Sequence, residues 1–123
     1  MALLNDRVFD NGLTVLDTEA DELWVCSGSE TLTYATLNSQ KLGTKSTPTV
    51  SSPADRSGGG REVTVSAISD GSVTASGTAA LWALVDTGNT RVLSVQSLAS
   101  TLAVTSGNTF TTDEATIGIP DPV

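Results

Sequence analysis

The feature that most constrains the fold is a two-residue alternation of apolar and polar side chains in the second half of the chain. Residues 61–68 alternate in this way, and residues 72–79 alternate again. A period of two is typical of a β-strand with one buried face. Asp70-Gly71 between the two segments is a preferred hairpin turn, so we expect the segments to pair. The apolar faces would carry Val63, Val65, Ala67, Val73, Ala75, Gly77 and Ala79.

Turn residues recur at short intervals in the rest of this half. Residues 81–86 are apolar on both faces, which predicts a central strand, and Gly88-Asn89 predicts a turn after it. Short strands separated by turns indicate a sandwich or a small barrel. The chain is therefore predicted to be all-β, an antiparallel β-sandwich or small barrel forming a single domain over residues 1–123. Further strands are expected at 90–98, 102–104, 109–112 and 115–119.

The composition supports many short strands over helices. The chain has 19 Thr and 15 Ser, and aromatic residues make up only 4%. Thr is β-branched and suits a pleated, half-exposed surface. In the first half, residues 3–17 predict a short helix or an irregular segment that packs on the sheet, residues 22–26 a buried strand, and residues 33–40 one or two helical turns.

Residues 43–60 show no alternation and contain two prolines followed by three glycines. A loop of this length is uncommon inside a compact domain. It is predicted to be an extended arm that a neighbouring subunit orders, with a mobile linker as the alternative. The prolines at residues 119–123 predict a C-terminal tail outside the sheet. Contacts to a neighbouring subunit are therefore expected at Pro48, Val50, Pro53, Arg56, Arg61, Pro120 and Pro122.

The formal net charge is −8, and acidic residues are concentrated near the N-terminus. This charge argues against direct nucleic-acid binding and against an anionic membrane surface. No apolar run is long enough for a transmembrane helix, and residues 1–6 do not resemble a signal peptide, so synthesis in the cytoplasm is expected. Cys26 is the single cysteine. Because it lies in the predicted buried strand, we expect Cys26 to be a small core residue, and the alternative is that it forms a disulfide between subunits.

The residues needed for common catalytic and metal sites are missing. The chain has no His, which excludes Ser-His-Asp and Cys-His catalysis and a structural zinc site. Asp113-Glu114 and Asp21-Glu22 are poor candidates for glycosidase chemistry, because adjacent strand residues point to opposite faces. Residues 17–21 alternate acids but lack the rest of a calcium loop. Residues 58–61 predict a hinge rather than a phosphate loop. No cofactor is expected.

Two tryptophans leave one alternative function open. Trp24 and Trp82 both lie in predicted strands, which favours core packing. A carbohydrate-binding β-sandwich would instead display one of these rings in a groove.

Residues 59–85, which read GGREVTVSAISDGSVTASGTAALWALV, carry a resemblance that continues at 91–93 and 104–110. This stretch resembles a group of small structural proteins encoded among the head and tail genes of tailed bacteriophages and prophages. The resemblance implies a virion component without an active site. The implied function is a capsid decoration (cement) protein that binds and stabilises the outer surface of the head. The alternative is a neck, tail, baseplate or fibre component.

The resemblance also sets the expected partners and location. The partners would be the major capsid protein or other virion proteins, together with further copies of the chain in a possible trimer. The location would be the virion. Extended arms and symmetric copies suit such a role, because many weak contacts add up when several copies bind together.

Overall fold

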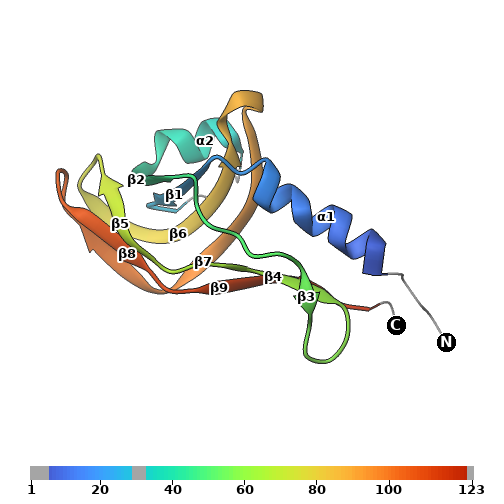
Figure 1. Ribbon diagram of the computed structural model, residues 1–123. Helices are drawn as coiled ribbons and strands as arrows, with labels where there is room; N and C mark the ends of the chain where they lie inside the picture. The colour runs from blue at the N-terminus through green and yellow to red at the C-terminus, as the bar shows by residue number, and fades with distance from the viewer. Residues whose placement is uncertain (1–5, 29–32, 122–123) are drawn as a thin grey trace.

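The computed structural model describes residues 6–28 and 33–121, and these form antiparallel sheets with two α-helices (Figure 1). The all-β prediction is confirmed, and the architecture is sandwich-like with a short N-terminal helix. The sheet does not close, so the barrel alternative is wrong. The elements are α1 (Asp6–Thr18), β1 (Glu22–Cys26), α2 (Tyr34–Ser39), β2 (Lys41–Ser46), β3 (Ala54–Asp55), β4 (Arg61–Val65), β5 (Ile68–Val73), β6 (Gly77–Asp86), the 3-10 helix η1 (Thr87–Asn89), β7 (Arg91–Val104), β8 (Thr109–Thr112) and β9 (Ala115–Ile119).

Six of the strands form one long, bent, two-stranded ribbon. Its inner arm, residues 61–86, carries β4, β5 and β6, and its outer arm, residues 91–119, carries β7, β8 and β9. The tip is η1, where the Asp86 carboxylate accepts hydrogen bonds from the backbone and side chain of Asn89. The two arms stay paired from the tip to the far end, with register shifts within the β6–β7 and β5–β8 ladders. The partners are Asp86 with Arg91, Gly77 with Val104, Ser72 with Thr109, Val65 with Ala115 and Arg61 with Ile119.

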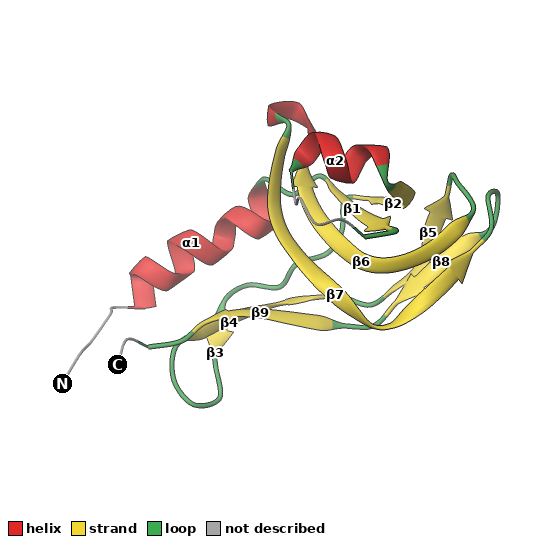
Figure 2. Ribbon diagram, turned by 180° about the vertical axis from the view of Figure 1, so that it is seen from behind, coloured by secondary structure: helices red, strands yellow, loops and turns green. Residues whose placement is uncertain are grey.

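The ribbon bends where both arms leave the strand conformation together. The inner arm is interrupted at residues 66–67 and 74–76, opposite the interruptions of the outer arm at 113–114 and 105–108. The bends let β6 pair with β1 and β5 pair with β2, so the six-stranded sheet has the order β7-β6-β1-β2-β5-β8. The far end of the ribbon joins β3 in a second sheet of order β3-β4-β9. Figure 2 shows the strong curvature that results.

Both faces of the large sheet are buried at its centre, in β1 and the second half of β6. On β6, Trp82 and Leu84 point to a core shared with α1 and the small sheet, while Leu81, Ala83 and Val85 point to a second core that contains Leu37 of α2. Helix α2 accordingly lies over the curved sheet (Figure 2). The double-sided burial explains why residues 81–85 are apolar without alternation.

The predicted hairpin turn at Asp70-Gly71 is wrong, because both residues lie inside β5. Gly71 pairs with Phe110 of β8. A Cβ atom at Gly71 would lie 2.2 Å from the Phe110 ring, so the glycine makes room for a buried aromatic side chain. The alternating segments 61–68 and 72–79 therefore follow each other along one arm and do not pair.

The extended arm at residues 43–60 is also a wrong prediction over much of its length. Residues 43–46 belong to β2, in the middle of the large sheet, and Val50 forms a bridge with Val65. Residues 54–55 form β3, which pairs with β4. The backbone of this segment is ordered by pairing with other strands of its own chain. It does so without the alternation of apolar and polar residues that would have indicated a strand.

The ends of the chain differ in part from the predictions. Helix α1 continues through Asn11-Gly12, because burial of Leu13 and Leu16 on one side of the helix holds it against the core. Residues 3–5 of the predicted N-terminal segment lie outside the described residues. The tail predicted at 119–123 begins at Pro120 in the structure, because Ile119 still pairs with Arg61 in β9.

Candidate functional site

Most of the residues predicted to contact another subunit are used inside the chain. Pro48 and Val50 are buried. Beside them, the backbone N–H of Ser51 donates to the carbonyl of Thr64 at 2.8 Å. This segment closes the core between the two sheets, so Pro48 and Val50 are not available to a partner, while Pro53 is partly exposed.

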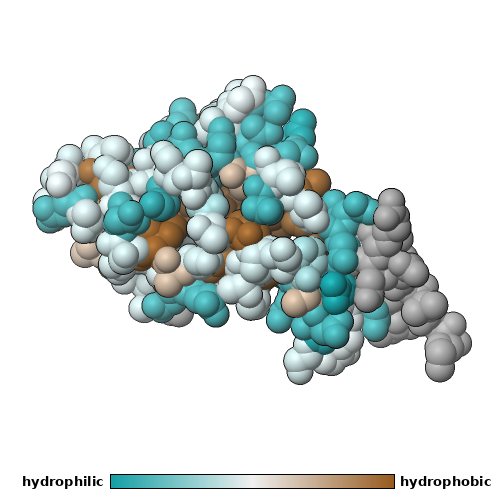
Figure 3. Space-filling view, in the orientation of Figure 1, coloured by the Kyte–Doolittle hydropathy of each residue, from teal (hydrophilic) through white to brown (hydrophobic). Residues whose placement is uncertain are grey.

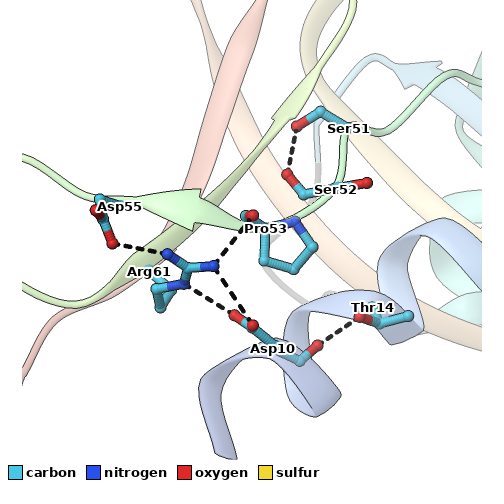
Figure 4. A network of polar contacts seen from close by, with 7 residues as sticks. All are labelled: Asp10, Thr14, Ser51, Ser52, Pro53, Asp55 and Arg61. Carbon is cyan, nitrogen blue, oxygen red and sulfur yellow. Dashed lines mark hydrogen bonds and ion pairs between the residues drawn. The ribbon is translucent and has the colours of Figure 1, made fainter. Parts of the chain in front are cut away.

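Arg61 is the clearest case, because it joins three elements of the same chain (Figure 4). Its Nε lies 3.0 Å from Oδ1 of Asp10 in α1, and its Nη1 lies 2.7 Å from Oδ1 of Asp55 in β3. Its Nη2 donates to the carbonyl of Pro53 at 3.3 Å. The planar guanidinium suits this fork of acceptors. The predicted subunit contact at Arg61 is therefore corrected to a clamp between α1 and the small sheet.

Residues 56–60 form a closed turn between β3 and β4 rather than a hinge. Arg56 donates from Nη1 to the carbonyl of Gly59 at 3.1 Å, and the N–H of Gly59 returns a bond to the carbonyl of Arg56. Gly60 has a φ of +95°, and a Cβ atom there would lie 2.0 Å from the carbonyl oxygen of Ile119. Pro120 is exposed beside this turn. Pro122 lies outside the described residues.

Cys26 is fully buried, and its Sγ lies 3.6 Å from the carbonyl oxygen of Leu37. Desolvation raises the pKa of its thiol to about 11, although the nearby Lys41 charge opposes the shift. A buried thiol of high pKa is a poor nucleophile. The core prediction for Cys26 is confirmed, and the burial contradicts the alternative of a disulfide between subunits.

The two tryptophans are core residues, as the sequence favoured. Trp24 and Trp82 are only 1% and 5% exposed. The Trp24 indole donates to the carboxylate of Glu22 at 2.9 Å, and the Lys41 ammonium lies 4.6 Å from its ring centre. Although Trp82 borders a hollow of the surface, both side chains are too well covered to act as a stacking platform. The carbohydrate-platform alternative is therefore wrong in the form the sequence suggested.

The acidic pair Asp113-Glu114 lines a hollow of about 350 Å³ where the outer arm bends. Both carboxylates are exposed and adjacent in the chain. Glycosidases hold two carboxylates on opposite sides of the scissile bond. Among the residues around the hollow, no further acid faces this pair, so the arrangement does not form such a site. The other lining residues are Trp82, Gln96, Ser97, Leu98, Ser100, Thr101, Leu102, Thr111, Thr112 and Ala115.

The other acidic candidates serve the fold. Asp21 accepts hydrogen bonds from the backbone N–H of Thr87 at 2.9 Å and from its hydroxyl. Desolvation raises the pKa of Asp21, but the bonds from Thr87 and nearby backbone groups outweigh it and leave the pKa below its usual 3.8. Within residues 6–28 and 33–121, no three His, Cys, Asp or Glu side chains are grouped closely enough to hold a metal ion.

The feature that sequence reasoning missed is the free edge of the outer arm. Each of β7, β8 and β9 ends a sheet, so in the described part of the chain none of them has a strand on its outer side. Residues 92–112 of this arm contain no charged side chain. No other stretch of the sequence this long is uncharged. That run was the available signal, but without the topology it could equally mark a buried strand.

The surface of the body also shows where contacts could form. On the face drawn in Figure 3, apolar surface reaches the middle of the body and is bordered by polar residues. Along the outer arm, Leu93, Leu98 and Leu102 are partly buried against the core and leave part of each side chain accessible. The outer arm therefore combines unpaired backbone with moderately apolar side chains.

None of the described helices is long and apolar enough to cross a membrane.

Comparison with known proteins finds no relative. The chain matches no protein-family profile, no curated protein and no solved structure.

Proposed function

We propose that this chain is a non-enzymatic structural protein of a tailed-bacteriophage virion, and that it acts as a capsid decoration protein on the outer surface of the head. The observation that carries an assembly role is the uncharged, unpaired outer edge of residues 92–112. An open strand edge is a template for pairing with another chain. A protein made to assemble uses such an edge, whereas a protein made to stay alone protects it.

The bacteriophage assignment comes from the resemblance of residues 59–85 to small head and tail proteins. In the structure these residues form most of the inner arm, the part that sets the shape of the body. The net charge of −8 supports an outward position on the head, since it disfavours contact with the packaged nucleic acid.

The surface assigned to the partner changes from the first expectation. Pro48, Val50 and Arg61 are engaged inside the chain, so they no longer support an arm that reaches a neighbour. The outer arm takes their place. It needs no disorder-to-order transition, which would cost about 1–2 kcal/mol per residue.

The test is to locate the chain in particles. Virions released from a strain that carries the gene are purified, and peptides of this chain are quantified by mass spectrometry against the major capsid protein. A decoration protein is expected at a copy number comparable to that of the capsid protein. A much lower ratio would place the chain in the neck, tail, baseplate or fibre, and its absence from intact particles would refute the proposal.

A second measurement tests the head surface directly. Purified heads that lack the chain are incubated with the recombinant protein, and binding is followed by sedimentation. Saturable binding that raises the temperature of head disruption is expected. A variant with Thr111→Glu, on the uncharged outer arm, should bind more weakly, whereas a variant with Thr78→Glu, an exposed position on β6, should bind as the wild type does.

A further inference from the structure

We propose that strand β7 pairs, antiparallel and across a two-fold axis, with β7 of a second copy of this chain. This inference rests on the proposed role of the outer arm as an assembly surface and names its partner. The expected product is a dimer that joins two large sheets edge to edge.

The other sheet edges carry features that discourage pairing. Strand β3 has two residues and directly follows Pro53. Strand β8 has four residues and is followed by Asp113. Strand β9 is preceded by Glu114 and followed by Pro120. Short length, charge and proline are the usual means by which proteins protect a strand edge.

Strand β7 lacks these features. It has 14 residues, contains no Pro, Asp, Glu or Lys, and carries one charge, Arg91, at its first position. The Arg91 guanidinium lies 3.2 Å from the Glu19 carboxylate of the same chain. Beyond Arg91 the edge is neutral, so its approach to a partner strand requires no charged side chain to lose water.

The charge distribution favours a second copy over an arbitrary acidic partner surface. Two chains of net charge −8 repel each other wherever acidic surfaces meet. At a β7–β7 contact the facing strands contain no acid, so the repulsion is lowest there. A two-fold axis also places the same edge on both sides, so the contact needs no second open edge of different sequence.

The local geometry limits the contact to the first part of β7. The ladder with β6 is regular only from Ser94 to Ser97, opposite Leu84 to Leu81. Its register shifts between Val92 and Ser94, and it is interrupted again before Leu102 pairs with Ala79. The interruption bulges residues 98–101 toward the hollow, and bulges twist an edge away from a partner. The pairing segment is therefore Ser94–Ser97, with the partly buried Val92 and Val95 on its α2 side to add apolar contact.

The experiment measures the oligomeric state of the full chain against concentration by analytical ultracentrifugation. The wild type is expected to form a concentration-dependent dimer. Ser97→Lys puts two cations on the paired edges and should weaken dimerisation at least tenfold. The matched control is Ser72→Lys, which adds the same charge at an exposed position of β5, a strand with neighbours on both sides. It should leave the dimer unchanged.

Hydrogen exchange on the wild type tests the same contact without a substitution, so misfolding of a variant cannot affect the result. Amides of residues 94–97 should become more protected as the concentration rises, while those of 109–112 in β8 should not change. A wild type that stays monomeric at every concentration, a dimer that Ser97→Lys leaves intact, or protection confined to another segment would overturn the inference. A monomer that is still found on particles would overturn the β7 pairing and leave the virion role standing.

Discussion

The Phe110 ring packs against the backbone of Gly71 and Gly43, and replacing Gly71 with alanine should destabilise the protein strongly. Phe110 is 2% exposed and faces Gly71 across the β5–β8 pair. A Cβ atom at Gly71 would lie 2.2 Å from Cε1 and Cζ of the ring, and one at Gly43 would lie 2.9 Å from Cδ1. Carbon atoms in contact prefer a separation of about 3.5–4.0 Å. Gly71→Ala therefore forces the ring or the strand to move by more than about 1 Å.

The cost follows from what the displaced ring loses. Overpacking a well-packed site costs about 1–3 kcal/mol. Removing a Phe side chain from the core costs a further share of the roughly 1.5–3 kcal/mol gained by its burial. We expect Gly71→Ala to lower the free energy of unfolding by about 2–4 kcal/mol out of a total of about 5–15 kcal/mol. Urea titration followed by tryptophan fluorescence measures this, since Trp24 and Trp82 are both buried and report on unfolding.

Two further variants decide whether the ring is the cause. Gly12→Ala is the control, because a Cβ there meets only Cδ1 of Ile119 at 3.8 Å, and in the middle of α1 it should stabilise the protein by about 0.5–1 kcal/mol. Phe110→Ala alone should cost about 3–5 kcal/mol, and adding Gly71→Ala to it should cost little more. A loss below about 0.5 kcal/mol for Gly71→Ala, or an equal loss with and without the ring, would refute the reasoning.

Three other predictions test the polar contacts and the cysteine. Arg61→Lys keeps the charge but loses the forked contacts that join α1 to the small sheet. Thermal unfolding should show that the free energy of unfolding falls by about 1 kcal/mol, and by less in high salt. A variant as stable as the wild type would contradict the clamp. Because the pKa of Asp21 is lowered on folding, its contribution to stability is present above pH 3.8 and is lost as the pH falls through the folded pKa. Thr87→Val removes one donor and should make stability less sensitive to acid between pH 6 and pH 3; an unchanged slope would count against this. Cys26, with a pKa of about 11, should resist a thiol reagent at pH 8 until the protein unfolds, and rapid labelling of the native state would disprove its burial.

The sequence by itself determined the local character of most strands. The alternation around Val63 and Val65 reflects one buried face, and both residues are almost fully buried. The stretch 81–86, which has apolar residues on both faces, was correctly interpreted as a central strand, because such residues must be covered on both faces. The absence of His is likewise enough to exclude Ser-His-Asp and Cys-His catalysis, since both require an imidazole.

The candidate site could be predicted only in part. The neutral run at 92–112 is visible in the sequence, but an uncharged run fits a buried strand as well as an exposed edge. Only the position of β7 at the end of the strand order distinguishes the two. For Arg61 the sequence suggested an exposed contact residue, because a charged residue after a glycine turn usually lies on the surface. The structure instead places it beside Asp10, which is 51 residues away in the chain.

Tertiary structure alone decided how the strands are joined. Asp70-Gly71 has the chemistry of a hairpin turn, yet Gly71 lies in a strand because the Phe110 ring needs the space that a Cβ would take. Residues 43–50 lack strand alternation, yet they order against β1, β5 and β4. Local pattern records which side of a residue is buried, and that preference acts over a few residues. Pairing partners are chosen by the packing of segments far apart in the chain, which no local pattern contains.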